Sequence, residues 1–166
     1  AIDAGIVYVP EERGKQGVVV DLPIFQNVSL PSLGKTSRNG FLQLAEEFTL
    51  VRDYATRLDL RAASLSQHAG TLSGGNQQKV VVAKWLATQP KVIILDEPTS
   101  GMDNATEKLF IASLQPYIEQ KTMILITHKS TMLELIDRLI VVNEGQVVAD
   151  GPKEKIIKML AGHNNS

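Results

Sequence analysis

The sequence predicts an α/β protein built on a mostly parallel β-sheet with helices on both faces. Largely apolar runs of strand length, at residues 92–95 and 122–127, alternate along the chain with longer segments of helical periodicity. These runs lack the alternation of strands that have one face in water, so we expect them to be buried within the sheet. With 166 residues and 43% hydrophobic content, the chain can form one real core.

The first part of the chain contains one predicted strand and a mixed region after it. Residues 5–9 form a short β-branched and aromatic run that proline closes, which is typical of a buried strand. Two prolines and an Asn-Gly turn signal predict irregular structure with at most one short helix over residues 21–40. Apolar residues at helical spacing predict a surface helix over residues 41–60.

The second part alternates helices with the two apolar strands. Ser73 is a suitable N-cap for a long helix that stops at Pro90. The pattern also predicts a helix at 104–114 with Asn104 as its cap and Pro116 beyond its end, a helix at 130–136, a β-hairpin around Asn143-Glu144-Gly145, and a last helix at 153–160.

Composition excludes several classes of function. The 17 Lys and Arg residues balance 18 Asp and Glu residues, so the chain has no basic excess for binding nucleic acid. It has no cysteine, and its three histidines are scattered, which argues against a transition-metal site. Its apolar runs are far shorter than the roughly 20 residues that cross a bilayer, so we expect no direct membrane insertion.

An adjacent acid pair ends the apolar run at residues 92–95. In phosphoryl-transfer ATPases an acid at the end of such a strand holds Mg²⁺, and a neighbouring acid orients or deprotonates the attacking water. We assign these roles to Asp96 and Glu97 respectively. The alternative is that one of these acids only caps the turn that follows the strand.

A glycine-rich turn precedes the long helix and offers a phosphate site. Ser73, Gly74 and Gly75 present backbone N–H groups at a helix N-terminus, where positive partial charge favours an anion. The structural alternative is a glycine turn with a serine cap.

These two motifs together resemble those of the ATP-binding cassette (ABC) ATPases. LSGGNQQK at 72–79 resembles the signature motif, and VIILDEP at 92–98 resembles the Walker B strand. The resemblance covers nearly the whole chain. It implies that ATP is contacted by four residues of the signature motif, Ser73, Gly74, Gly75 and Asn76. It also implies that Asp96 holds Mg²⁺ and that Glu97 is the catalytic base.

Three further segments fit the same family. SGMD at 100–103 resembles the D-loop, with Asp103 at its acidic position. ITH at 126–128 resembles the switch strand, whose histidine, here His128, reaches the γ-phosphate; a lone histidine near a strand end is otherwise more often a hydrogen-bonded structural residue. YVPE at 8–11 stands at the Q-loop position, with Glu11 in place of glutamine.

The resemblance implies a P-loop NTPase-like (RecA-like) fold with a small helical subdomain and a C-terminal β-hairpin. We expect residues 1–166 to form part of an ABC ATPase domain, with about 21–88 as the helical subdomain and 1–20 and 89–166 as the RecA-like core. The implied partners are a second cassette, bound head to tail, and transmembrane permease subunits. The implied location is cytoplasmic, at the inner face of the membrane through the permease.

The phosphate loop of such ATPases is not recognisable in the sequence. In the family this loop and the first strands lie upstream of the Q-loop, and we expect both to be missing here. Gly34, Lys35 and Thr36 resemble the end of the motif, but Ser29 replaces its first glycine and Pro31 lies within it, which indicates a chance match. The resemblance therefore implies that Asp96, Glu97 and His128 act on a phosphate loop outside this chain.

Two subfamilies contribute to the resemblance. The first hundred or so residues resemble the second cassette of bacterial carbohydrate importers of the ribose and galactose type, which typically has Glu in the Q-loop and lacks the switch histidine. The remainder resembles the ATPase domain of type I secretion exporters. We therefore expect a nucleotide-binding unit for transport, with carbohydrate import as the first expectation. An exporter domain, a composite chain and a non-hydrolytic, dimer-completing fragment are the alternatives.

Overall fold

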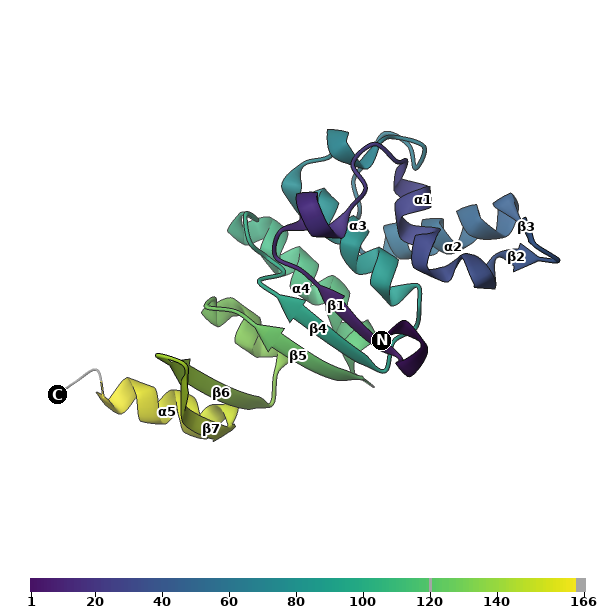
Figure 1. Cartoon of the computed structure of the whole chain (residues 1–166). Helices are drawn as coiled ribbons and strands as arrows, with labels where there is room; N and C mark the ends of the chain where they lie inside the picture. Colours follow the sequence, from purple (N-terminus) through teal and green to yellow (C-terminus); the bar gives the residue numbers. More distant parts are fainter. Residues whose placement is uncertain (120, 164–166) are drawn as a thin grey trace. The chain divides into compact units, whose positions relative to one another are not determined.

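The computed structural model describes residues 1–119 and 121–163, and the chain forms two compact units, Ala1–His128 and Lys129–Ser166. The first unit contains a three-stranded parallel sheet of order β1-β4-β5, made of β1 (Ile6–Val9), β4 (Val92–Asp96) and β5 (Thr122–Ile126) (Figure 1). The register pairs Ile6 with Val92 and Val92 with Thr122, so all three strands run side by side from the same end. The predicted parallel sheet is confirmed.

One face of this sheet carries the core of the first unit. Val7, Val9, Ile93 and Leu95 are at most 3% exposed and lie in a hydrophobic cluster with residues of α3 (Gly74–Leu86) and α4 (Asn104–Ile118). Helices were expected on the opposite face of the sheet as well, but the strand side chains on that face are exposed. Ile6, Tyr8, Ile124 and Ile126 are between 40% and 50% exposed. An apolar strand sequence indicates that both faces suit burial, but not what covers them.

Both sheet-covering helices begin at a side-chain cap. Ser73 caps α3, as predicted from the sequence. The predicted cap of α4 was wrong by one position: Asp103 accepts the Ala105 and Thr106 amides, and Asn104 is the first helical residue. The α4 helix also continues past Pro116 to Ile118, which is buried, although Pro116 has no backbone N–H to bond to the preceding turn.

The region between β1 and α3 is more ordered than its prolines and glycines predict. A π-helical turn at Arg13–Gly17 is followed by α1 (Ile24–Ser29) and a 3₁₀ turn at Leu30–Lys35. The Asn-Gly signal forms a two-residue turn between β2 (Ser37–Arg38) and β3 (Phe41–Leu42). Helix α2 (Leu44–Arg57) therefore begins three residues later than predicted, because residues 41 and 42 pair as a strand.

Helices α1, α2 and α3 pack together, with Ile24, Val28, Val51, Leu58 and Val80 in their shared core. A short 3₁₀ turn at Ala69–Thr71 leads into the residues that precede α3. The assignment of about 21–88 to a separate helical subdomain stays a prediction.

The second unit, taken by itself, is a hairpin with a helix. A 3₁₀ helix at Ser130–Leu135 stands where an α-helix was predicted, and it buries Met132. The predicted hairpin joins β6 (Arg138–Asn143) to β7 (Gln146–Pro152), and its turn residues Glu144 and Gly145 both have positive φ. Helix α5 (Lys153–His163) packs on β7 through buried Ile156.

Candidate functional site

Glu97 lies at the carboxyl end of β4 and is held by the neighbouring strand end. Its backbone N–H donates to Ile126 O at 2.9 Å, and its φ is 41°. Its carboxylate accepts bonds from Thr127 Oγ1 at 3.1 Å and from the His128 backbone N–H at 2.9 Å. The side chain is 13% exposed, so these contacts fix the carboxylate in one orientation.

His128 makes a second contact with the same carboxylate. Its Nδ1 lies 2.7 Å from Glu97 Oε1, and the histidine side chain is 82% exposed. Because an ionised carboxylate only accepts hydrogen bonds, Nδ1 carries the hydrogen of this contact. In the neutral ring Nε2 is then an acceptor, so donation from Nε2 to a phosphate oxygen requires the protonated ring.

Asp96 lies beside Glu97 and shares its carboxylate with β1. The Tyr8 hydroxyl donates to Asp96 Oδ2 at 2.7 Å. This hydrogen bond, together with desolvation and the negative charges of Asp96 and Glu11, raises the pKa of Tyr8 above its ordinary value. Glu11 follows β1 after Pro10 and is exposed. The carboxyl ends of three adjacent parallel strands therefore gather Asp96, Glu97, His128 and Tyr8.

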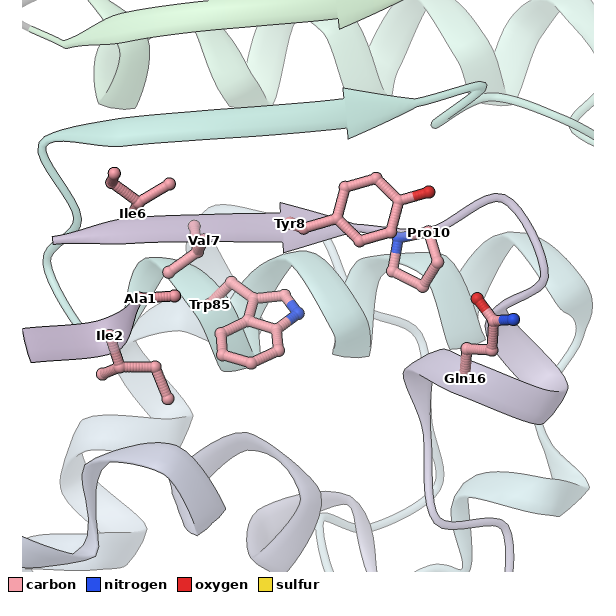
Figure 2. A pocket seen from close by; sticks show the side chains of 8 residues that line it. All are labelled: Ala1, Ile2, Ile6, Val7, Tyr8, Pro10, Gln16 and Trp85. Atoms are coloured by element: carbon pink, nitrogen blue, oxygen red, sulfur yellow. The ribbon is translucent and has the colours of Figure 1, made fainter. Parts of the chain in front are cut away.

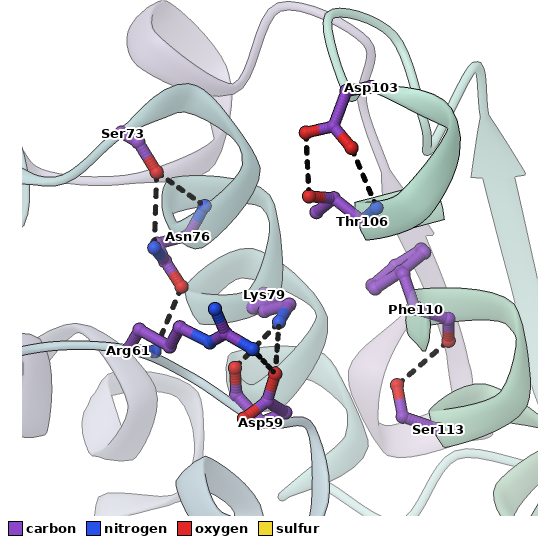
Figure 3. Close-up of polar contacts among 9 residues, drawn as sticks. All are labelled: Asp59, Arg61, Ser73, Asn76, Lys79, Asp103, Thr106, Phe110 and Ser113. Carbon is purple, nitrogen blue, oxygen red and sulfur yellow. Dashed lines mark hydrogen bonds and ion pairs between the residues drawn. The ribbon is translucent and has the colours of Figure 1, made fainter. Parts of the chain in front are cut away.

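A second group of candidate residues lies at the N-terminus of α3. Ser73 Oγ accepts from the Asn76 backbone N–H at 3.5 Å and from Asn76 Nδ2 at 3.1 Å (Figure 3). Asn76 Oδ1 accepts the Arg61 backbone N–H at 2.9 Å. The turn at residues 73–75 is thus anchored through Asn76 to the loop that follows α2.

Asp103 and the start of α4 lie against the same turn. A side chain at Gly75 would be in ordinary contact with Met102 and Thr106, at 3.7 and 3.6 Å. Asp103 is exposed, and the hydrogen bonds from Thr106 and Ala105 lower the pKa of its carboxyl group. Figure 3 shows Asp103 and Thr106 joined by these bonds at the N-terminus of α4.

Arg13 connects the segments that carry the candidate residues, and the sequence reasoning missed it. Its Nη1 donates to Ser100 O at 2.8 Å. Its Nη2 lies where side chains at Gly74 and Gly101 would be, at 2.6 and 3.0 Å from the added Cβ atoms. The Ser100 backbone N–H in turn donates to Glu97 O at 2.9 Å. The only signal in the sequence was one arginine shortly after the predicted strand at residues 5–9.

An apolar pocket of the first unit lies along β1. This pocket of about 240 Å³ is lined by Ile6, Val7, Tyr8 and Trp85, with Ala1, Ile2, Pro10 and Gln16 (Figure 2). Apart from Tyr8 it contains none of the groups described above, and its lining offers little to a phosphate. It is not the candidate site.

The sequence around Lys35 is not arranged as a phosphate loop. Lys35 Nζ donates to Ala87 O at the end of α3, and burial lowers the pKa of this amine. Thr36 is 4% exposed, and its hydroxyl donates to Leu33 O. Both side chains bond to backbone carbonyls of this chain, which agrees with a chance match to the phosphate-loop motif.

The sequence of the chain matches a known family over more than half of its length. The profile of the ABC transporter family matches residues 3–100. The chain belongs to this family. It is 59% identical over 153 residues to the ribose import ATP-binding protein RbsA of Roseobacter denitrificans, which covers 90% of the chain and 30% of that relative. It is 54% identical over 169 residues to ribose import ATP-binding protein RbsA 1 of Rhizobium meliloti, which covers 98% of the chain and 34% of the relative.

Two consequences follow from these relatives. The chain spans about a third of the length of these two ribose import ATP-binding proteins. Because the second alignment includes 98% of the chain, the similarity to ribose importers continues through the residues after Ser100.

Solved structures of ABC cassettes have the same fold. The dimeric post-hydrolysis cassette MJ0796 bound to ADP and Pi matches with a TM-score of 0.77 and 26% identity, over 89% of this chain and 62% of that one. A bacterial Atm1-family ABC exporter with ATP bound matches with a TM-score of 0.74 over 94% of this chain and 26% of that one. At 21% identity the latter shows the fold alone. Nucleotide binding is a property of the family to which the chain belongs.

The acids at the strand ends suit a magnesium ion whose other ligands are not protein side chains. Carboxylate oxygen is the ligand type that Mg²⁺ prefers, and Mg²⁺ commonly takes only one or two carboxylates beside water and phosphate oxygens. Over residues 1–119 and 121–163, no three His, Cys, Asp or Glu side chains gather as a complete metal site. Asp96, with one oxygen bonded by Tyr8, fits the role of a single protein ligand.

Over residues 1–119 and 121–163, no helix has the length and apolar character to cross a bilayer.

Proposed function

We propose that this chain belongs to the ATP-binding subunit of a carbohydrate importer, in which ATP binding and hydrolysis drive transport across a membrane. The observation that carries this proposal is the 59% identity to a ribose import ATP-binding protein over 90% of the chain. The grouping of Asp96, Glu97 and His128 at adjacent strand ends supports it, because that is the edge of an open parallel sheet where ligands bind.

Three residues are proposed to act on ATP held by a phosphate loop of the same cassette. Asp96 would hold Mg²⁺, which when bound neutralises charge on the phosphate oxygens. Glu97 would accept a proton from the attacking water, and its bonds from Thr127 and His128 would keep it oriented. His128, with Nδ1 on Glu97, would donate from Nε2 to the γ-phosphate when its ring is protonated.

The residues at the N-termini of α3 and α4 are proposed to act on ATP held by a second cassette. Ser73, Gly74 and Gly75 would contact its γ-phosphate in a head-to-tail dimer, with Asp103 at the same interface. Glu11, at the end of β1, would lie beside the nucleotide at the Q-loop position. The two cassettes of this dimer would lie at the cytoplasmic face of the membrane, bound to permease subunits.

Hydrolysis of Mg-ATP tests the role of Glu97. The assay uses a subunit that carries this sequence together with a phosphate loop, and compares Glu97→Gln with Glu119→Gln, a change at an exposed acid. Removal of a general base costs about 100-fold or more in turnover. We expect Glu97→Gln to lose turnover while ATP binding persists, and Glu119→Gln to behave as the parent protein.

Two results would count against this proposal. Unchanged turnover in Glu97→Gln would reject Glu97 as the base. Absence of turnover in the parent protein as well would favour a non-hydrolytic cassette that completes a dimer.

A further inference from the structure

We propose that Asn76 is a positioning residue that compels the Ser73 hydroxyl to donate its hydrogen outward, to an acceptor such as a phosphoryl oxygen. This inference rests on the proposed role of the turn at residues 73–75. It assigns to Asn76 a task different from direct contact with the nucleotide.

The orientation of the Asn76 amide follows from its partner on the loop after α2. A backbone N–H can only donate, and the Arg61 N–H points at Asn76 at 2.9 Å. The Asn76 atom that receives it must therefore be the carbonyl oxygen. The other end of the amide, which lies 3.1 Å from Ser73 Oγ, must be the NH₂ group, which only donates.

The polarity of the Ser73 hydroxyl follows from this orientation. A serine hydroxyl has two acceptor lone pairs and one hydrogen. Asn76 supplies two donors to the oxygen, its side-chain NH₂ and its backbone N–H at 3.5 Å. The hydrogen of the hydroxyl is left to point away from Asn76, and Ser73 is exposed. The turn is thereby prepared for a ligand that accepts hydrogen bonds.

The Arg61 amide can set this polarity because its loop is fixed to α3. Lys79 is 3% exposed, and its Nζ donates to Asp59 O at 2.6 Å. The Arg61 guanidinium pairs with Asp59 Oδ2 at 3.2 Å. Figure 3 shows the resulting chain of contacts from Lys79 through Asp59, Arg61 and Asn76 to Ser73. Burial lowers the pKa of Lys79, and its bond to Asp59 compensates for part of the lost hydration.

The substitution Asn76→Asp reverses the polarity and leaves the anchor in place. The new carboxylate has the same shape as the amide and still accepts the Arg61 N–H, but it cannot donate to Ser73. The Ser73 hydroxyl then donates to this carboxylate and no longer to the ligand. A negative charge in the first turn of a helix is favourable, so the melting temperature should be unchanged or higher. A purely structural role for Asn76 would therefore predict little functional change.

The experiment is a double-mutant cycle in the subunit used for the hydrolysis assay. It compares Asn76→Asp, Ser73→Ala and the double variant by the kcat/KM for Mg-ATP, by the inhibition constant of ADP and by melting temperature. Loss of a hydrogen bond to a charged group corresponds to roughly 10- to 100-fold. We expect a fall of that size in kcat/KM for each single variant, no further fall in the double variant, and unchanged inhibition by ADP, which has no γ-phosphate.

The outcomes separate this inference from the proposed function. Normal kcat/KM in Asn76→Asp beside a defective Ser73→Ala overturns the inference and leaves the role of the turn intact. An equal loss from Asn76→Asp in both backgrounds also overturns it, because repulsion by the new charge does not need the Ser73 hydroxyl. Normal kcat/KM in Ser73→Ala would overturn both the inference and the proposed role of the turn.

Discussion

Substitution of Gly74 by alanine should have opposite effects on stability with and without Arg13. In the native chain the added Cβ would lie 2.6 Å from Arg13 Nη2 and 3.4 Å from its Cζ and Nε. The guanidinium must therefore move, and it would lose its 2.8 Å bond to Ser100 O. When Arg13 is replaced by alanine, the obstacle is gone and the new methyl group has space.

The magnitudes decide the sign in each background. Alanine is favoured over glycine in a helix by up to about 1 kcal/mol. Loss of a bond with a charged donor costs about 1.5–3 kcal/mol. Gly74→Ala should therefore lower the free energy of unfolding by about 0.5–3 kcal/mol in the native chain, and raise it by up to about 1 kcal/mol in the Arg13→Ala background.

Urea unfolding followed by tryptophan fluorescence measures these changes. Trp85 is the single tryptophan of the chain and lies on α3, so it reports on the unit that contains Gly74. Gly75→Ala is the matched control, because its Cβ would make only ordinary contacts at 3.6 and 3.7 Å, with Thr106 and Met102. It should be stabilising in both backgrounds. A coupling between Gly74→Ala and Arg13→Ala below about 0.5 kcal/mol would refute the assignment of Arg13 to this position.

Two further predictions concern the stability of the first unit. Asp103→Asn should lower the melting temperature at neutral pH; because folding lowers the pKa of Asp103, its carboxylate stabilises the fold above about pH 4 and loses this effect as the pH falls through the lowered pKa. Between pH 7 and pH 3, the difference in melting temperature between the parent protein and Asp103→Asn should become smaller. A constant difference would contradict this prediction. Leu95→Ala, at a residue that is 0% exposed, should cost about 2–5 kcal/mol in urea unfolding, whereas Ile126→Ala, at 50% exposure, should cost far less; equal costs would contradict the one-sided core.

The elements that the sequence predicted correctly are those whose signals are local. The strand at residues 92–96 begins with a continuous apolar run over residues 92–95, and Ser73 is a capping residue directly before a helical pattern. The acid pair could be placed because it ends that strand. The pairing of β5 with β4 could be anticipated only through the family resemblance, since strand order is a long-range property.

The features that the sequence did not predict depend on a choice between two adjacent capping residues or on contacts between distant segments of the chain. Asp103 and Asn104 are both good caps, and only the backbone geometry selects the first. Arg13 acquires its role from segments that lie 61 and 87 positions further along the chain, at Gly74 and Ser100. No pattern near Arg13 could reveal those partners.

Glu97 shows why the candidate site departs from local rules. A glutamate with a φ of 41° is in the left-handed region, which disfavours side chains other than those of glycine and asparagine. Its backbone bond to Ile126 and its carboxylate bonds from Thr127 and His128 offset that strain. A residue that only capped a turn would be replaced by glycine or asparagine without loss, and such a replacement would remove the carboxylate that the strand end orients. The strained conformation and the bonds that maintain it are therefore best explained together, by a requirement for a carboxylate at this point and in this direction.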